Sequence, residues 1–308
     1  MLSGKILALC GFGLGATMLA GPGVAQDHVQ LQLSEQREFT FDNGETYLID
    51  AGGMRVELGV EDPDPNAEYD EVIVARVHRK GAEDFTQTFT AGFSLFADVG
   101  YWPLDRDGEP SLVLQAFTGG AHCCMDVFAV RPEGSSGWAA TPIGYVDGGE
   151  VVPEDLDGDG LVEFRLADER FNYTFDAYAF SVPPPTIFAT RGGELADLSA
   201  EPRFRPVYEN FYDYAALLCT GAANDDPDSG SFTSEYAPNS ACASLMAVGA
   251  RLGIYDGTKA LVGAARLSRP QQDQDWTDYL IITDDSEETF TDLIDAADYA
   301  LKAWGYLD

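Results

Sequence analysis

The spacing of apolar residues changes near Glu201-Pro202, and this change constrains the fold more than any other feature of the sequence. Before it, short segments rich in β-branched and aromatic residues alternate with turn residues, which is typical of β-strands. After it, apolar residues recur at helical intervals. We therefore predict an α+β fold, with a β-rich region over residues 26–200 and a small helical domain over residues 201–308.

The strands of the β-rich region are indicated by residue type and by turn signals. Residues 37–41 and 45–50 flank Asn43-Gly44, a pair that suits a type I′ turn, so we expect them to form a hairpin. The other expected strands are residues 72–77, 111–117, 126–130 and 163–167. A region of this length is too short for a full seven-bladed propeller. We therefore expect a small sandwich or a partial, propeller-like stack.

Three helices are expected in the C-terminal part. The apolar stripe of the first comprises Tyr208, Phe211, Tyr212, Ala215 and Cys219. The second is expected to begin at Asn239 or Ser240. The last is expected to begin with a capping-box pair, Asp285 and Glu288, and to end at Gly305. Its expected stripe comprises Phe290, Leu293, Ile294, Ala297, Leu301 and Trp304. The stretch from 222 to 238 is expected to be a surface loop.

The first 25 residues have the features of a secretory signal peptide. Lys5 supplies a positive charge, and an uncharged, small and apolar run follows over residues 6–20. Gly23-Val24-Ala25 then offers the small residues that a signal peptidase requires. The run is too short to favour a membrane anchor. We therefore expect cleavage before Gln26 and a periplasmic or secreted bacterial protein without a membrane span in the mature chain.

Charge excludes some classes of partner. The chain carries 52 acidic and 18 basic residues and a formal net charge of −34. Such a field repels nucleic acid and anionic lipid, and it attracts divalent cations. We therefore expect no nucleic-acid partner.

One loop has the pattern of a calcium site. Residues 155–163 read D-x-D-x-D-G-x-x-E, with oxygen ligands at alternate positions and a glycine where the backbone must turn sharply. The pattern departs from an EF-hand at its twelfth position, where Leu166 stands, and a strand is expected to follow. The expected Ca²⁺ ligands are the carboxylates of Asp155, Asp157, Asp159 and Glu163 and the main-chain carbonyl of Leu161.

This loop, followed by a strand, resembles the calcium loops of FG-GAP/VCBS repeats in exported β proteins. Residues 104–108 resemble a degenerate copy, in which Arg106 would crowd a cation, and we interpret them as a structural turn. The segments Gly119–Cys124 and Pro183–Pro185 also resemble a group of exported bacterial proteins of unknown function. The resemblance implies export and a calcium-type repeat, and it implies no activity.

Four cysteines follow the signal segment: Cys123, Cys124, Cys219 and Cys242. In an oxidising compartment this even number favours two disulfides. Cys219 and Cys242 lie on apolar helical faces and are expected to pair. Cys123 and Cys124 are adjacent, beside His122. They could form a strained vicinal disulfide, pair separately with the helical cysteines, remain structural thiols, or bind copper or zinc together with His122.

No nucleophile elbow, phosphate-binding loop or histidine-based catalytic set is evident. We therefore hypothesise a non-enzymatic, calcium-stabilised protein of the cell envelope that binds a protein or polysaccharide. Two alternatives are a calcium-dependent hydrolase acting on an envelope polymer, and a periplasmic redox or copper-handling protein using the His-Cys-Cys turn. A concave pocket with two carboxylates and aromatic walls would favour the hydrolase.

Overall fold

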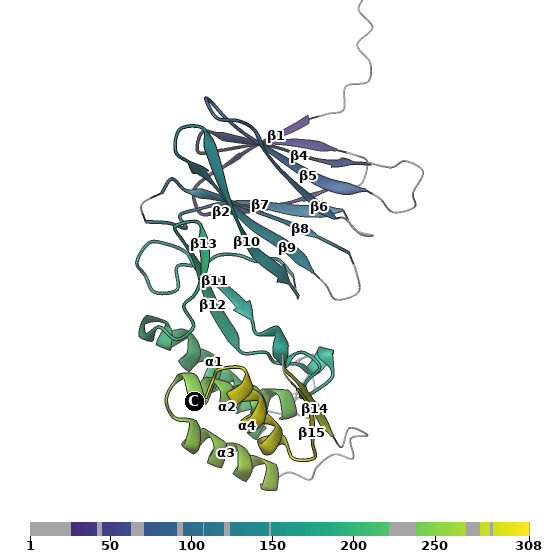
Figure 1. Ribbon diagram of the computed structural model, residues 1–308, viewed down its shortest axis with the longest axis vertical. Helices are drawn as coiled ribbons and strands as arrows, with labels where there is room; N and C mark the ends of the chain where they lie inside the picture. The colour runs from purple at the N-terminus through teal and green to yellow at the C-terminus, as the bar shows by residue number, and fades with distance from the viewer. Residues whose placement is uncertain are drawn as a thin grey trace, which may run out of the picture.

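A computed structural model places two large β-sheets at one end of the molecule and four α-helices at the other (Figure 1). The α+β class expected from the sequence is confirmed. The structure describes residues 26–41, 45–62, 71–90, 95–106, 108–119, 124–147, 149–221, 238–268, 278–283 and 286–307.

The first sheet has five strands in the order β1-β3-β4-β5-β6. β1 and β3 run parallel, and the other neighbours are antiparallel. The strands are β1 (Gln26–Leu31), β3 (Thr46–Ala51), β4 (Met54–Glu61), β5 (Val72–Arg79) and β6 (Phe85–Thr90).

The second sheet also has five strands, in the order β10-β9-β8-β7-β2, and all its pairs are antiparallel. The strands are β2 (Glu35–Thr40), β7 (Phe96–Trp102), β8 (Ser111–Phe117), β9 (Met125–Glu133) and β10 (Gly137–Val146).

The two sheets pack face to face and share one core. Ile49 and Val56 of the first sheet are fully buried in the same cluster as Val99 and Leu114 of the second. Side chains alternate between the two faces of a strand, so each sheet contributes every second residue to this layer. Of the two architectures expected, the sandwich is the one observed.

The expected hairpin between residues 37–41 and 45–50 is wrong. β2 pairs with β7 in the second sheet, whereas β3 lies in the first. Phe39 and Phe41 are buried in the shared core, and their rings lie 4.9 and 5.5 Å from the ring of Tyr47. The chain therefore crosses the sandwich here, because burying both phenylalanines outweighs the local turn preference. Asn43 and Gly44 themselves lie outside the described residues.

The outer face of the second sheet is covered by the following part of the chain. Val113 and Val127 of this face share a cluster with Val151, Val162 and Phe164. The buried side chain of Gln115 accepts a hydrogen bond from the Val151 amide (3.0 Å) and donates to its carbonyl (2.9 Å). The segment that carries the acidic loop is therefore held against the sandwich.

A small sheet joins this segment to the helices. Its strands, β11 (Phe164–Ala167), β12 (Pro185–Arg191) and β13 (Glu194–Asp197), pair in that order. Ile187 packs in one cluster with Phe204, Tyr208 and Val248 from the helical part. Three short 3₁₀ helices lie nearby: η1 (Glu169–Phe171), η2 (Tyr178–Phe180) and η3 (Pro202–Phe204).

The helical part contains α1 (Arg205–Thr220), α2 (Pro238–Arg251), α3 (Tyr255–Ser268) and α4 (Leu293–Ala303). α3 was not expected from the sequence. The two strands β14 (Tyr279–Ile282) and β15 (Glu287–Phe290) form a hairpin beside them. Of the described helices, none is both long and apolar enough to cross a membrane.

The expected start of the last helix is wrong. Asp292, not Asp285, caps α4, because its Oδ1 accepts the amides of Ile294 (2.8 Å) and Asp295 (3.1 Å). Glu288 and Phe290 lie in β15. Position 285 lies outside the described residues.

Candidate functional site

The acidic loop is closed by a bridge between Glu154 and Glu163. The amide of Glu154 donates to the carbonyl of Glu163 over 2.9 Å, and the reverse bond measures 2.8 Å. The next residue begins β11, so the loop is anchored at the edge of a strand, as the sequence predicted.

Within the loop, the side chains of the aspartates hold the backbone in a curl. Asp155 accepts the amides of Gly158 (2.8 Å) and Gly160 (3.1 Å). Asp157 accepts the amide of Asp159 over 3.0 Å. Gly160 has a φ of +89°, a conformation that residues with a Cβ rarely adopt. The glycine at this position is therefore required by the turn.

The curl brings three of the five expected ligands together. Carboxylate oxygens of Asp155, Asp157 and Asp159 all lie within 4.8 Å of one another. Oxygens gathered in this way on one loop suit a hard divalent cation, and Ca²⁺, for example, takes oxygen ligands at about 2.3 to 2.6 Å. The donor set alone does not distinguish calcium from other hard cations.

Glu163 has a different environment. Its side chain is buried, and its Oε2 accepts the amide of Leu156 over 3.0 Å. Burial raises the pKa of this carboxyl to about 6, and the hydrogen bond from Leu156 partly opposes the rise. The structure therefore places Glu163 at the base of the loop rather than among the three clustered carboxylates. Leu161, whose carbonyl was expected to bind the ion, lines an adjacent cavity.

Two arginines from distant parts of the chain reach the loop. Arg203 of η3 places Nη1 2.6 Å from Asp157 Oδ2 and 3.8 Å from Asp159 Oδ2. Arg106, from the connection between β7 and β8, donates from Nη2 to Asp159 Oδ2 over 2.5 Å. The sequence suggested only that Arg106 would crowd a cation within the degenerate copy. In the structure, Arg106 contacts the intact loop instead.

The degenerate copy behaves as a turn within the described residues. The amide of Gly108 donates to the carbonyl of Asp105. The Asp105 carboxylate faces Arg131, whose Nε lies 3.6 Å from Oδ2, and both of these atoms are buried without a hydrogen bond. Asp107 lies outside the described residues.

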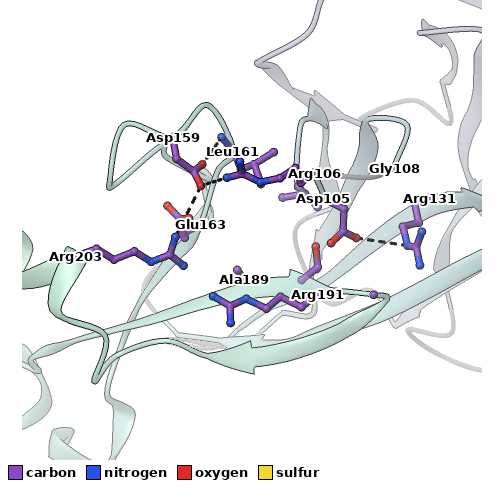
Figure 2. Close-up of a pocket in the computed structure, with 13 residues that line it drawn as sticks. Asp105, Arg106, Gly108, Arg131, Asp159, Leu161, Glu163, Ala189, Arg191 and Arg203 are labelled. Atoms are coloured by element: carbon purple, nitrogen blue, oxygen red, sulfur yellow. Dashed lines mark hydrogen bonds and ion pairs between the residues drawn. The ribbon is translucent and has the colours of Figure 1, made fainter.

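A cavity of about 360 Å³ lies between the loop, the β7–β8 connection and β12 (Figure 2). Four arginine side chains line it: Arg106, Arg131, Arg191 and Arg203. Three carboxylates, of Asp105, Asp159 and Glu163, also line it. Spacing along the sequence could not reveal this cluster, because its members come from separate segments.

A second cavity, of about 660 Å³, lies between η1, η2, β14 and the end of α4. Its aromatic walls include Tyr173, Phe175, Phe180, Tyr279 and Trp304, and its carboxylates are those of Glu169, Asp176 and Asp278. Burial raises the pKa of Asp176 to about 6, although amide hydrogen bonds from Ala177 and Ser240 oppose the rise. Asp176 Oδ2 is buried without a hydrogen bond, and Tyr173 has a positive φ of 61°.

The expected Cys219–Cys242 disulfide is present, and it joins α1 to α2. Cys124 is disulfide-bonded as well. Its partner lies outside the described residues, as do His122 and Cys123. Because Cys219 and Cys242 bond to each other, Cys124 is not bridged to the helical part.

Part of the chain is similar to two known proteins. It is 37% identical over 142 residues to a probable thylakoid lumen protein of Synechocystis sp., covering 45% of this chain and 41% of that protein. It is 31% identical over 191 residues to an uncharacterized protein of Sinorhizobium fredii, covering 58% of this chain and 29% of that protein.

The chain therefore spans less than half the length of either relative. No family model matches it, and no solved structure matches it. The similarity to a lumen protein indicates an exported or lumenal protein. The signal peptide expected over the first 25 residues lies outside the described residues.

Proposed function

We propose that the protein is an exported binding protein that holds one Ca²⁺ in the loop Asp155–Glu163 and is stabilised by it. The observation that carries this proposal is the convergence of the Asp155, Asp157 and Asp159 carboxylates within 4.8 Å on a closed loop. Export to the periplasm or beyond gives access to calcium at the concentrations that extracellular modules bind, on the order of 10⁻⁴ to 10⁻³ M.

The position of the loop supports a stabilising role. Gln115 holds the segment before the loop to the outer face of the sandwich through Val151. Arg203, at the start of the helical part, forms an ion pair with Asp157 of the loop. An ion bound there would reduce the repulsion among three like charges in the folded state alone. A ligand that binds only the native state raises its stability by mass action.

Thermal unfolding in calcium and in chelator tests the proposal. We expect millimolar Ca²⁺ to raise the melting temperature of the wild type and to leave that of Asp157→Ala unchanged. Asp213→Ala is the matched control, because Asp213 is an exposed acid on α1 and does not belong to the cluster of loop carboxylates. It should respond like the wild type. A wild-type melting temperature that does not change up to several millimolar calcium would refute the proposal.

The second cavity favours one alternative function, binding or hydrolysis of an envelope polysaccharide. Its aromatic walls and three carboxylates are the features expected of a sugar site. Oligosaccharide binding and hydrolysis, measured with wild type and Asp176→Asn, test this alternative. Binding or turnover that disappears in the variant, with the calcium response retained, would assign the function to this cavity.

A further inference from the structure

We propose that the arginine-lined cavity beside the acidic loop binds an oxyanion, such as a phosphate monoester, and that Ca²⁺ in the loop strengthens this binding. The calcium part of this inference rests on the proposed function, whereas the anion part rests on the arginines. Phosphate groups are favoured over single carboxylates because several guanidinium groups can each donate to a different oxygen.

These four arginines lie together in one cavity although basic residues are few in this chain. The sequence has 52 acidic and only 18 basic residues, yet four arginines from four different segments line one cavity. Figure 2 shows the guanidinium groups of Arg106, Arg191 and Arg203 on the side of Asp159 and Glu163, with Arg131 and Asp105 at the other end. The cavity lining holds four guanidinium groups against three carboxylates. An anionic ligand therefore meets more donors and less repulsion there than elsewhere on this negative protein.

The ion pairs of these arginines leave most of their donors available. A guanidinium has five N–H donors. Among the described residues, Arg106 donates one hydrogen bond, to Asp159, and Arg191 donates one, to Glu201. Arg203 donates two, to Glu201 and Asp157. The Arg131 Nε is buried and makes none. The cavity can therefore offer several donors to one ligand without breaking these pairs.

The charge balance of the site depends on the ion. Six carboxylates belong to the cavity, to the adjoining acidic loop or to an ion pair with Arg203, against the four guanidinium groups: Asp105, Asp155, Asp157, Asp159, Glu163 and Glu201. With every group ionised, the excess of two negative charges opposes an anion. One Ca²⁺ at the aspartates balances that excess.

Calcium would also act through the arginines directly. Asp157 forms an ion pair with Arg203, and Asp159 forms one with Arg106. When these carboxylates coordinate an ion, their hold on the two guanidinium groups weakens, and more donors face the cavity. Cation and anion binding are then linked, and each ligand raises the affinity for the other by the same factor.

Titration calorimetry with glycerol 2-phosphate, in chelator and in 1 mM Ca²⁺, tests the inference on the whole chain without its signal segment. We expect binding in both conditions, on the order of tenfold tighter with calcium, a typical coupling factor. Acetate, a single carboxylate, should bind much more weakly. In Arg191→Gln the phosphate affinity should fall at least severalfold, and the calcium response of the melting temperature should persist.

Arg165→Gln is the matched control, because Arg165 is similarly exposed and paired with Glu154 but does not line the cavity. It should bind as the wild type does.

Absence of phosphate binding in both conditions overturns the anion site, even if calcium still raises the melting temperature. Equal affinity with and without calcium overturns the coupling. Phosphate binding that persists in a protein without any calcium response would refute the calcium proposal and the coupling, and retain the anion site. Equal loss in Arg165→Gln and Arg191→Gln would show nonspecific attraction and overturn the site.

Discussion

Arg203 Nη1 lies 2.6 Å from Asp157 Oδ2, so the residue pair joins the start of the helical part to the acidic loop on the sandwich. The Asp157 side chain is only 6% exposed and that of Arg203 is 34% exposed. The guanidinium also donates to Glu201 and lies over the ring of Phe204. Arg203 therefore holds the Asp157 carboxylate through an ion pair, and a cation bound to the loop would compete with Arg203 for this carboxylate.

This competition predicts that Arg203→Gln binds calcium more tightly than the wild type. Removing one positive charge close to a divalent ion should raise the affinity by about tenfold at low ionic strength, and by less in high salt. Calorimetric titration with calcium measures the change. Arg205→Gln, which loses a pair with the exposed Glu209 outside the site, is the control and should bind as the wild type does. Equal or weaker calcium binding by Arg203→Gln would show that the pair does not compete with the ion.

The buried Asp98 on β7 predicts a specific pH dependence of stability. Both of its carboxylate oxygens are buried without a hydrogen bond. Burial, with smaller contributions from Glu150 and Glu38, raises its pKa from 3.8 to about 7. As the pH rises, the Asp98 carboxyl loses its proton near pH 4 in the unfolded chain but only near pH 7 in the folded protein. The contribution of Asp98 to folding stability is therefore fully present below about pH 4 and is lost as the pH rises to about 7.

Asp98→Asn should therefore unfold at higher denaturant concentration than the wild type at pH 8, by a difference on the order of 2 to 4 kcal/mol. The difference should shrink as the pH approaches 4, because protonated aspartic acid and asparagine are both neutral. Urea unfolding of both proteins at several pH values measures it. A difference that is independent of pH would show that Asp98 does not titrate as the structure indicates.

The Cys219–Cys242 bridge, whose cysteines lie 23 positions apart, predicts a large loss of stability in the double variant Cys219→Ala/Cys242→Ala. The loop-entropy model gives about 3 kcal/mol for a loop of this size. Both sulfurs are buried in the helical core, so the two Ala substitutions add some loss of packing. Denaturant unfolding measures the change, with the reduced wild type as the comparison. Stability within 0.5 kcal/mol of the oxidised wild type, on the order of an ordinary surface change, would contradict it.

The sequence was sufficient for the parts of the fold that depend on local pattern. β8 spans Ser111–Phe117 as expected, and α1 contains the whole expected stripe from Tyr208 to Cys219. The prediction of a hairpin was wrong because β2 pairs with β7, which lies far from it in the sequence, and because Phe39 and Phe41 are buried in the shared core. The start of α4 was misplaced because Asp292 outcompetes the earlier capping pattern.

The candidate site likewise has one part that the sequence predicts and another that it does not. The three aspartates stand at alternate positions in one segment, so the sequence alone could place them together. The arginines could not be predicted, because Arg106, Arg131, Arg191 and Arg203 approach from separate strands and turns. Their importance follows only from the tertiary arrangement. The resemblance to FG-GAP/VCBS repeats and the vicinal pairing of Cys123 and Cys124 both stay predictions.

Calorimetric titration of the wild type and Asp157→Ala with calcium tests the central claim most directly. We predict one Ca²⁺ per wild-type chain, because only the Asp155–Glu163 loop among the described residues gathers three such ligands. The dissociation constant should be on the order of 10⁻⁴ to 10⁻³ M, and Asp157→Ala should show no binding in this range. Undetectable heat with the wild type, or equal binding by both proteins, would contradict the assignment of calcium to this loop.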